Sequence, residues 1–157
     1  GREHTFAWKL SQSALKPVIY VAPGNGGTAS IAKNINIKPT DFEAIENFCL
    51  NEKIDLVLPG GEDSLVAGIV DYFKTNPNLS SIPVIGPELR GALLEGSKDY
   101  AKEFMQRHNV PTAAYKSFDK NSLNEGINFL KSLNAPYVLK ADGLAAGKGV
   151  LILNNLD

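Results

Sequence analysis

Short apolar runs alternate with amphipathic stretches over about the first 90 residues. The runs at 18–22, 54–58 and 83–85 are rich in β-branched residues and bounded by Gly or Pro, which predicts buried parallel strands. Between them, residues 42–49 and 64–73 carry apolar side chains at helical spacing and predict helices. This alternation predicts an α/β fold with a doubly wound parallel sheet.

The start of the chain departs from this rhythm. Residues 3–13 follow a helical pattern, but no strand precedes them. A doubly wound fold normally opens with a strand that leads through a glycine-rich turn into the first helix. We therefore expect a strand upstream of Gly1; the alternative is that residues 3–13 form a separate N-terminal helix.

The pattern changes after Gly86, where helical and strand signals no longer alternate evenly. This change predicts a second, α+β unit, and we place the domain boundary between residues 92 and 93. The periodicity predicts helices at 97–108 and 122–133 and strands at 113–118, 137–140 and 150–153.

Two capping boxes predict where helices begin. Thr40 with Glu43, and Ser122 with Glu125, have the spacing at which a hydroxyl and a carboxylate each accept from the other's backbone N–H group. We expect helices to start directly after Thr40 and Ser122.

Composition narrows the class of protein. The 157 residues are 43% hydrophobic and 21% charged, which is ordinary for a globular protein. Sixteen Lys and Arg against seventeen Asp and Glu give a formal charge of −1, so we expect no nucleic-acid partner bound through bulk charge. The longest apolar runs are far shorter than the about 20 residues that cross a bilayer, so we expect no membrane partner. The single cysteine, Cys49, excludes an internal disulfide and has the spacing of a buried residue, which fits a reducing cytoplasm.

Glycine-bearing loops follow each predicted strand of the first unit. In an open parallel sheet, ligands bind outside the carboxyl ends of the strands, so segments 1–4, 23–28, 59–62 and 86–88 should gather at one edge. Glycines allow backbone N–H groups to approach an anion, and Arg2 can bind a phosphate bidentately. These loops predict a site for a small phosphorylated ligand. Within it, Glu62 either orients an amine or ribose hydroxyl, or stabilises the start of the next helix.

A second glycine-rich loop joins the strands at 137–140 and 150–153. Its sequence matches the P-loop motif only in part, because Asp142 stands where that motif needs Gly and Gly149 stands where it needs Ser or Thr. A Gly/Ala loop in a hairpin can instead close over a triphosphate and exclude water. Lys140, at the end of its strand, could then meet phosphate oxygens. The alternative is a disordered hairpin tip.

Several segments in combination resemble the glycinamide ribonucleotide synthetase (phosphoribosylamine–glycine ligase) family, an ATP-grasp family of purine biosynthesis. They run collinearly over essentially the whole chain: Gly-Arg-Glu-His-Thr-Phe-Ala-Trp-Lys-Leu at 1–10, Ala-Pro-Gly-Asn-Gly-Gly-Thr at 22–28, Leu-Glu-Gly-Ser-Lys at 94–98, Ala-Lys-Glu-Phe-Met at 101–105, and the loop sequence at 140–150. The resemblance implies a pre-ATP-grasp domain over 1–92 that lacks its first strand, and the beginning of an ATP-grasp domain over 93–157. One segment departs from the family: Gly60-Gly-Glu-Asp-Ser-Leu65 keeps the acid at Glu62 but lacks two prolines that are usual there.

The resemblance implies ATP-dependent ligation of glycine to 5-phosphoribosylamine through glycyl phosphate, which gives glycinamide ribonucleotide, ADP and phosphate. The implied partners are therefore small molecules, and the implied cofactors are ATP and Mg²⁺. The family's metal ligands lie beyond Asp157, so residues 1–157 alone are expected to be inactive. No residue here is assigned to catalysis or to a metal. The implied ATP-binding residues are Lys98, Lys140, Gly143, Gly147, Lys148 and Gly149, and the implied substrate-binding residues are Gly1, Arg2, Glu3, His4, Gly24, Asn25, Gly26, Gly27, Thr28 and Glu62.

Alternative functions remain at this stage. One is another ATP-grasp ligase of purine metabolism, although residues 2–10 argue against it. A nucleotide-binding oxidoreductase domain should open its first helix with Gly-x-Gly-x-x-Gly, of which only Gly1 is present. A binding module without enzymatic activity is a third hypothesis.

Overall fold

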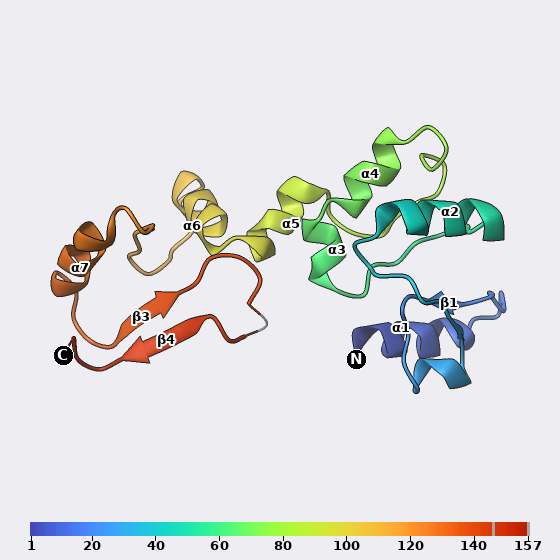
Figure 1. The fold of residues 1–157 in the computed structure, drawn as a ribbon, viewed down its shortest axis with the longest axis horizontal. Helices are drawn as coiled ribbons and strands as arrows, with labels where there is room; N and C mark the ends of the chain where they lie inside the picture. Colours follow the sequence, from blue (N-terminus) through green and yellow to red (C-terminus); the bar gives the residue numbers. More distant parts are fainter. Residues whose placement is uncertain (146, 157) are drawn as a thin grey trace. The chain divides into compact units, whose positions relative to one another are not determined.

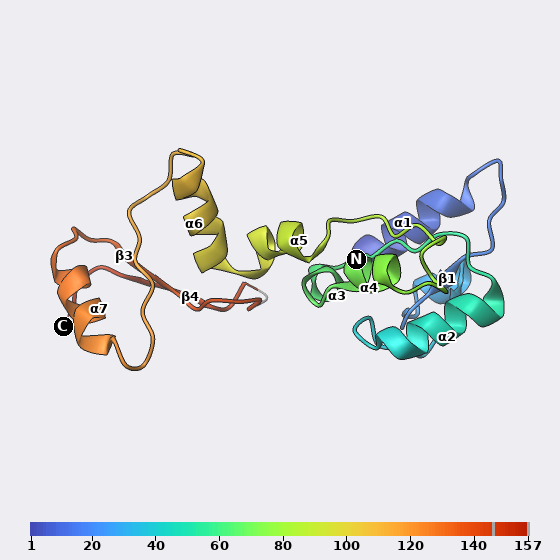
Figure 2. The same cartoon turned by 90° about the horizontal axis from the view of Figure 1, so that it is seen from above.

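The computed structural model describes residues 1–145 and 147–156 and divides into two compact units, Gly1–Ala92 and Leu93–Asp157 (Figures 1 and 2). The first unit contains helices and short strands. In chain order these are α1 (Arg2–Ser11), β1 (Tyr20–Val21), the 3-10 helix η1 (Thr28–Ser30), β2 (Lys33–Asn34), α2 (Phe42–Glu52), α3 (Glu62–Val66) and α4 (Ile69–Thr75).

Parallel strand pairing in the first unit confirms the predicted α/β class. β1 pairs in parallel with β2, in the register Tyr20 with Lys33, and Val57 forms a parallel bridge with Val84. Each of the three predicted apolar runs therefore supplies paired residues, although the paired stretches are shorter than the runs. β2 was not predicted, because two residues are too few to show a periodicity.

Helix α2 begins one residue later than its capping box predicts. The N-cap is Asp41 rather than Thr40, because the Asp41 carboxylate accepts a hydrogen bond from the amide of Ala44 at 3.2 Å. A side-chain oxygen that accepts from an N3 amide satisfies one of the donors that a helix start leaves open. The helix ends at Glu52 and is followed by Lys53, whose φ of 52° lies in the left-handed region.

The predicted helix over 64–73 is wrong in one respect, because it is two helices. Gly68 has a φ of +91° and separates α3 from α4. Glycine reaches this left-handed conformation without a steric penalty, so it ends the first helix and redirects the second. The apolar spacing continues across the break, and for this reason the sequence pattern did not reveal it.

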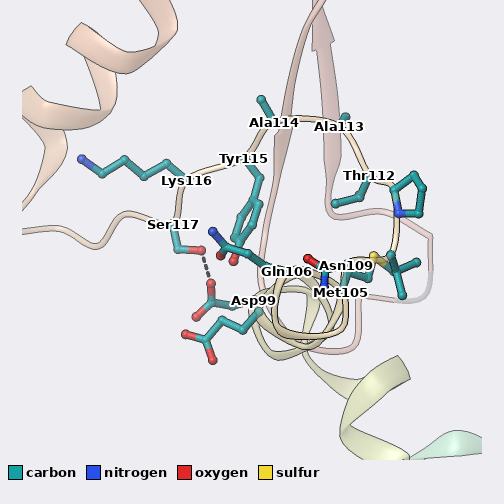
Figure 3. Close-up of a pocket in the computed structure, with 13 residues that line it drawn as sticks. Asp99, Met105, Gln106, Asn109, Thr112, Ala113, Ala114, Tyr115, Lys116 and Ser117 are labelled. Carbon is teal, nitrogen blue, oxygen red and sulfur yellow. Dashed lines mark hydrogen bonds between the residues drawn. The ribbon is translucent and has the colours of Figure 1, made fainter.

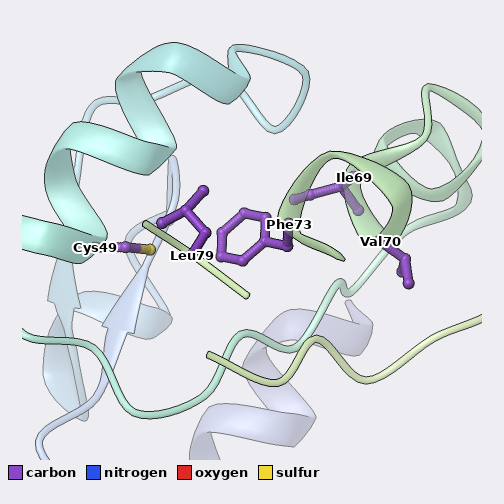
Figure 4. Close-up of a cluster of buried hydrophobic side chains, with 5 residues drawn as sticks. All are labelled: Cys49, Ile69, Val70, Phe73 and Leu79. Carbon is purple, nitrogen blue, oxygen red and sulfur yellow. The ribbon is translucent and has the colours of Figure 1, made fainter. Parts of the chain in front are cut away.

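The first unit has its own hydrophobic core between α2, α4 and the segment after α4 (Figure 4). Leu79 and Phe73 are 0% and 1% exposed. Full burial of a large apolar side chain stabilises a fold by about 1.5–3 kcal/mol. Cys49 is buried here as predicted, and burial raises the pKa of its thiol to about 11. The core cluster comprises Cys49, Ile69, Val70, Phe73 and Leu79.

The second unit combines helices with an antiparallel hairpin. β3 and β4 have the predicted bounds and pair in the register Lys140 with Val150. The helix α5 was not predicted, because Gly91 and Gly96 lower its helical propensity. The elements are α5 (Leu89–Gly96), which crosses the division between the units, α6 (Lys98–Arg107), α7 (Leu123–Lys131), β3 (Tyr137–Lys140) and β4 (Val150–Leu153).

Two predictions for the second unit are wrong. Residues 113–118 are extended but form no strand, because the described residues provide no partner ladder; the Lys102 ammonium binds the Ala113 carbonyl oxygen at 3.1 Å instead. Ser122 does precede α7, but its hydroxyl binds Asp119 at 2.7 Å and does not cap the helix. The short acceptor three residues upstream competes with the helix for the same hydroxyl.

Across the two described ranges, 1–145 and 147–156, the helices are too short or too polar to cross a lipid bilayer.

Candidate functional site

The start of α1 meets the start of α3 through an ion pair. An Arg2 guanidinium nitrogen donates to a Glu62 carboxylate oxygen at 2.5 Å, across 60 positions of sequence. This hydrogen bond lowers the pKa of Glu62 and raises the pKa of Arg2, so both groups are charged at neutral pH. Glu62 is also the first residue of α3, where a negative charge is favourable. Both hypotheses for Glu62 are therefore compatible with its position.

The N-terminal segment also lies against two of the glycine loops. A Cβ atom at Gly60 would stand 2.5 Å from Cγ of Glu3, and one at Gly27 would stand 3.5 Å from Nδ1 of His4. Residues 1–4 and the loops at 23–28 and 59–62 thus gather in one place, as the strand-end argument predicts. We call these three segments the N-terminal site.

The fourth predicted loop has other contacts. The Glu88 carboxylate forms an ion pair with Lys74, and a Cβ atom at Gly86 would meet Leu65 at 2.5 Å. Within the described part of the chain, no recorded contact joins residues 86–88 to the N-terminal site. The prediction that this loop joins the site has no support in the structure.

Hydrogen bonds within the loop after β1 determine its conformation. The Asn25 carboxamide oxygen accepts from the amides of Gly27 at 2.8 Å and Thr28 at 3.1 Å. The buried Thr28 hydroxyl accepts from the amide of Asn25 at 2.8 Å and donates to Asn34 at 2.7 Å. Three loop amides are therefore used inside the loop, and the expectation that these amides face an anion does not hold in this conformation.

Glycine is required at one position of this loop and leaves another open. Gly24 has a φ of +78°, and a Cβ atom there would lie 2.2 Å from the Asn34 side chain. A Cβ atom at Gly26 would meet no described atom within 4 Å. The loop is therefore packed on the Asn34 side and open at Gly26.

The glycine-rich loop between β3 and β4 is closed at its base by a backbone hydrogen bond of 2.7 Å from Ala141 to Gly149. Gly143 and Gly147 have φ values of +81° and +75°. The Lys98 ammonium, at the start of α6, donates to the Gly143 carbonyl oxygen at 2.8 Å. The structure therefore brings Lys98 to the first glycine of the loop.

The remaining loop residues are less constrained by contacts. The side chains of Lys140 and Lys148 are exposed, and no hydrogen bond to either is recorded within the described residues. Residue 146 of this loop lies outside the described residues. Sequence analysis missed Asp142, whose carboxylate binds the start of α6; the Asp in place of a P-loop glycine was the available signal.

A pocket of about 790 Å³ lies elsewhere in the second unit, between α6 and the segment 109–117 that follows it (Figure 3). The Ser117 hydroxyl donates to Asp99 at its wall. Glu103 and Lys116 also line the pocket, but none of the residues predicted to bind ATP does. The pocket therefore does not coincide with either predicted site.

The described residues were also compared with the needs of a metal ion. Among them, no group of three or more His, Cys, Asp or Glu side chains could hold a metal. The described residues therefore do not fit Mg²⁺, and none of them is assigned to that ion. The expectation that the metal ligands lie beyond Asp157 remains a prediction.

Fold and loops together define an ATP-grasp type of protein, in which an α/β unit precedes a hairpin with a glycine-rich loop. Residues 1–95 match the family model described as phosphoribosylglycinamide synthetase, N domain, and residues 96–157 match that of the ATP-grasp (A) domain of the same synthetase. The chain belongs to the phosphoribosylglycinamide synthetase family. This membership favours the ligase hypothesis over the oxidoreductase alternative.

Curated relatives match along the whole chain. The chain is 45% identical over 159 residues to the phosphoribosylamine–glycine ligase of Escherichia coli K12, which covers 100% of this chain and 36% of that protein. It is 48% identical over 157 residues to a bifunctional purine biosynthetic protein of Schizosaccharomyces pombe, with coverage of 97% and 19%. The chain thus spans about a third of the length of the Escherichia coli ligase.

Solved structures agree on the fold. The crystal structure of phosphoribosylamine–glycine ligase from Thermotoga maritima is 34% identical with a TM-score of 0.67, and the match covers 98% of this chain and 34% of that one. A biotin carboxylase domain of 2-oxoglutarate carboxylase from Hydrogenobacter thermophilus, solved with MgADP, has a TM-score of 0.73 at 21% identity, covering 99% of this chain and 36% of that one. At this identity the second likeness supports the fold alone.

Proposed function

We propose that the chain is part of an ATP-dependent ligase that joins glycine to 5-phosphoribosylamine and releases ADP and phosphate. The observation that carries this proposal is the 45% identity with the Escherichia coli ligase across both units. In this proposal residues 1–92 are the pre-ATP-grasp domain and residues 93–157 begin the ATP-grasp domain. The protein acts in the cytoplasm on small molecules.

The N-terminal site is proposed to hold the phosphoribosylamine. A guanidinium group has five N–H donors, so Arg2 can bind Glu62 and a phosphate together. The Glu62 carboxylate, kept ionised by this contact, can accept a hydrogen bond from the sugar amine. Because three amides of the loop at 24–28 donate within the loop, the phosphate contacts are assigned to Arg2, His4 and the open side at Gly26.

The second unit is proposed to hold the ATP phosphates. Lys98 and Lys140 supply positive charge, and the loop 143–149 closes over the nucleotide and excludes water. Lys148, on the loop, adds a mobile point charge. Mg²⁺ would neutralise further phosphate charge when bound, but the described residues supply no ligand set for it.

The reaction needs positioning and charge neutralisation rather than a covalent enzyme intermediate. Transfer of the γ-phosphoryl group to the glycine carboxylate gives ADP and glycyl phosphate. The amine of phosphoribosylamine then attacks the glycyl carbonyl carbon, phosphate leaves, and the amine loses a proton. The chain's own residues bind and orient the sugar and the nucleotide for these two steps.

Steady-state kinetics of the full-length protein test the proposal. Arg2→Ala should raise the KM for phosphoribosylamine about tenfold to a hundredfold, because a charge-assisted contact is worth roughly 1.5–3 kcal/mol. The KM for ATP should change little. Arg90→Ala, at an exposed arginine of α5, is the matched control and should behave as the parent protein. An Arg2→Ala protein that is impaired only in its use of ATP would contradict the assignment.

Variants in the glycine-rich loop should have the opposite profile. Lys148→Ala should lower kcat, because loop closure aligns the γ-phosphate. Lys140→Ala should weaken the use of ATP far more than phosphoribosylamine binding. Residues 1–157 purified alone should make no product, since no metal site exists among the described residues. Glycine-dependent product from residues 1–157 alone would contradict this expectation.

A further inference from the structure

The Asp142 carboxylate binds the N-terminus of α6. Its Oδ1 atom accepts from the backbone amides of Lys98 at 2.7 Å and Asp99 at 3.3 Å. Its Oδ2 atom accepts from the hydroxyl of Ser97, the N-cap residue, at 3.1 Å. The first amides of a helix have no partner within the helix, and the helix dipole favours a negative charge there. Asp142 therefore satisfies donors that the sequence of α6 leaves open.

A second bond runs in the opposite direction between the same two segments. The Lys98 ammonium donates to the carbonyl oxygen of Gly143, the residue after Asp142, at 2.8 Å. The loop and α6 are thus joined in both directions. The Asp142 carboxylate of the loop binds the backbone of α6, and the Lys98 ammonium of α6 binds the backbone of the loop. In Figure 1 the start of the loop after β3 lies beside the start of α6, in agreement with these bonds.

The charge state of Asp142 supports this contact. Burial raises the pKa of the carboxyl group, but hydrogen bonds from the backbone of Asp99, Gly143 and Lys98 and from the Ser97 hydroxyl outweigh burial. The pKa is therefore below its ordinary value, and the group is a carboxylate at neutral pH. A charged acceptor forms shorter and stronger hydrogen bonds than a neutral one.

We propose that Asp142 is a positioning residue that anchors the glycine-rich loop to the start of α6 and so places Lys98 beside the nucleotide phosphates. An ammonium has three N–H donors, and the bond to Gly143 uses one of them. Lys98 can thus bind the loop backbone and a phosphate oxygen together, while Asp142 holds the loop at the start of α6. The catalytic part of this inference rests on the proposed function, whereas the anchor itself does not.

Hydrogen exchange on the full-length protein without nucleotide tests the anchor. Asp142→Ala should speed exchange at the amides of Lys98 and Asp99 and at the loop amides 143–145 at least tenfold. Asp142→Asn keeps a side-chain oxygen acceptor and should restore part of the protection. Asp99→Ala is the matched control, because it removes a carboxylate of the same helical turn that binds Ser117 and not the loop. Unchanged loop exchange in Asp142→Ala would overturn the anchor.

Kinetics separate positioning from simple stabilisation. Asp142→Ala should lower kcat/KM for ATP about tenfold to a hundredfold, with the KM for phosphoribosylamine within twofold of the parent value, and Asp142→Asn should recover part of the loss. Equal losses for both substrates, with a lower melting temperature, would mean a structural role and overturn the proposal. If the parent protein binds no nucleotide, the proposed function and the catalytic part of this inference both fail, and the exchange rates still decide the anchor.

Discussion

The two units hold their candidate sites by different means. The unit Gly1–Ala92 contains a buried core, in which Phe73 and Leu79 are 1% and 0% exposed. In the described part of Leu93–Asp157 only Gly96 and Gly126 are buried. The hairpin there exposes apolar side chains, with Leu151 62% and Ile152 67% exposed.

The two units therefore differ in the interactions that determine their loop conformations. In the first unit, packing and an internal hydrogen-bond network determine the loop conformations. In the second, hydrogen bonds between Asp142, Lys98 and the loop backbone do so, with little packing beneath them. Packing that involves many atoms is cooperative, whereas a few exposed hydrogen bonds open locally at low cost.

The largest expected effect tests the core of the first unit. Phe73→Ala should lower the free energy of unfolding by about 3–5 kcal/mol, because it removes a fully buried ring and leaves a cavity. Ile152→Ala in the same 157-residue chain should change it by less than about 0.5 kcal/mol, since this side chain is mostly exposed. Denaturant unfolding followed by circular dichroism measures both. Similar losses of unfolding free energy in the two variants would contradict the proposed difference in packing between the units.

A pair of glycine substitutions sharpens the comparison at the two loops. Gly24→Ala should cost roughly 2–5 kcal/mol, because it combines a left-handed φ with a clash against Asn34. Gly143→Ala has a similar φ but no described atom within 4 Å of the added Cβ, so it should cost only about 1–2 kcal/mol. Thermal unfolding of both variants gives the order, and the reverse order would show that the first loop is not the more tightly packed one.

The hydrogen-bond network of the first unit gives an intermediate effect. Thr28→Val keeps the shape of the side chain but leaves the Asn25 amide and the Asn34 oxygen without a partner, at a cost of about 1–3 kcal/mol. Thr40→Val is the control. Because Asp41 and not Thr40 caps α2, this control should stay within about 0.5 kcal/mol of the parent. A large loss of stability from Thr40→Val would instead indicate that Thr40 caps α2, as the sequence predicted.

The smallest expected effect concerns pH. The pKa of Glu62 is lower in the folded protein than its ordinary value, so the contact with Arg2 contributes stability above about pH 4.3, the ordinary pKa of Glu. That contribution disappears as the pH falls further, through the pKa of the folded state. It should be small, because the side chains of Arg2 and Glu62 are 65% and 39% exposed. Glu62→Gln should therefore flatten the acid limb of the stability curve slightly, and an unchanged limb would mean that the pair adds nothing.

Local patterns in the sequence determined a large part of this protein. The alternation of apolar runs predicted the α/β class, and the bounds of β3 and β4 agree with the strands predicted at 137–140 and 150–153. Helical spacing predicted the burial of Cys49, and the family resemblance followed from short segments. These features depend on residues close together in sequence, so the residues themselves reveal them.

Tertiary structure decided the contacts that join distant segments. The pairing of Arg2 with Glu62 spans 60 positions, and the bond from the Lys98 amide to Asp142 spans 44. The segment at 113–118 likewise has no strand partner among the described residues, which its local pattern could not reveal. A sequence pattern shows which side chains could donate or accept, but only the fold brings a donor within about 3 Å of its acceptor.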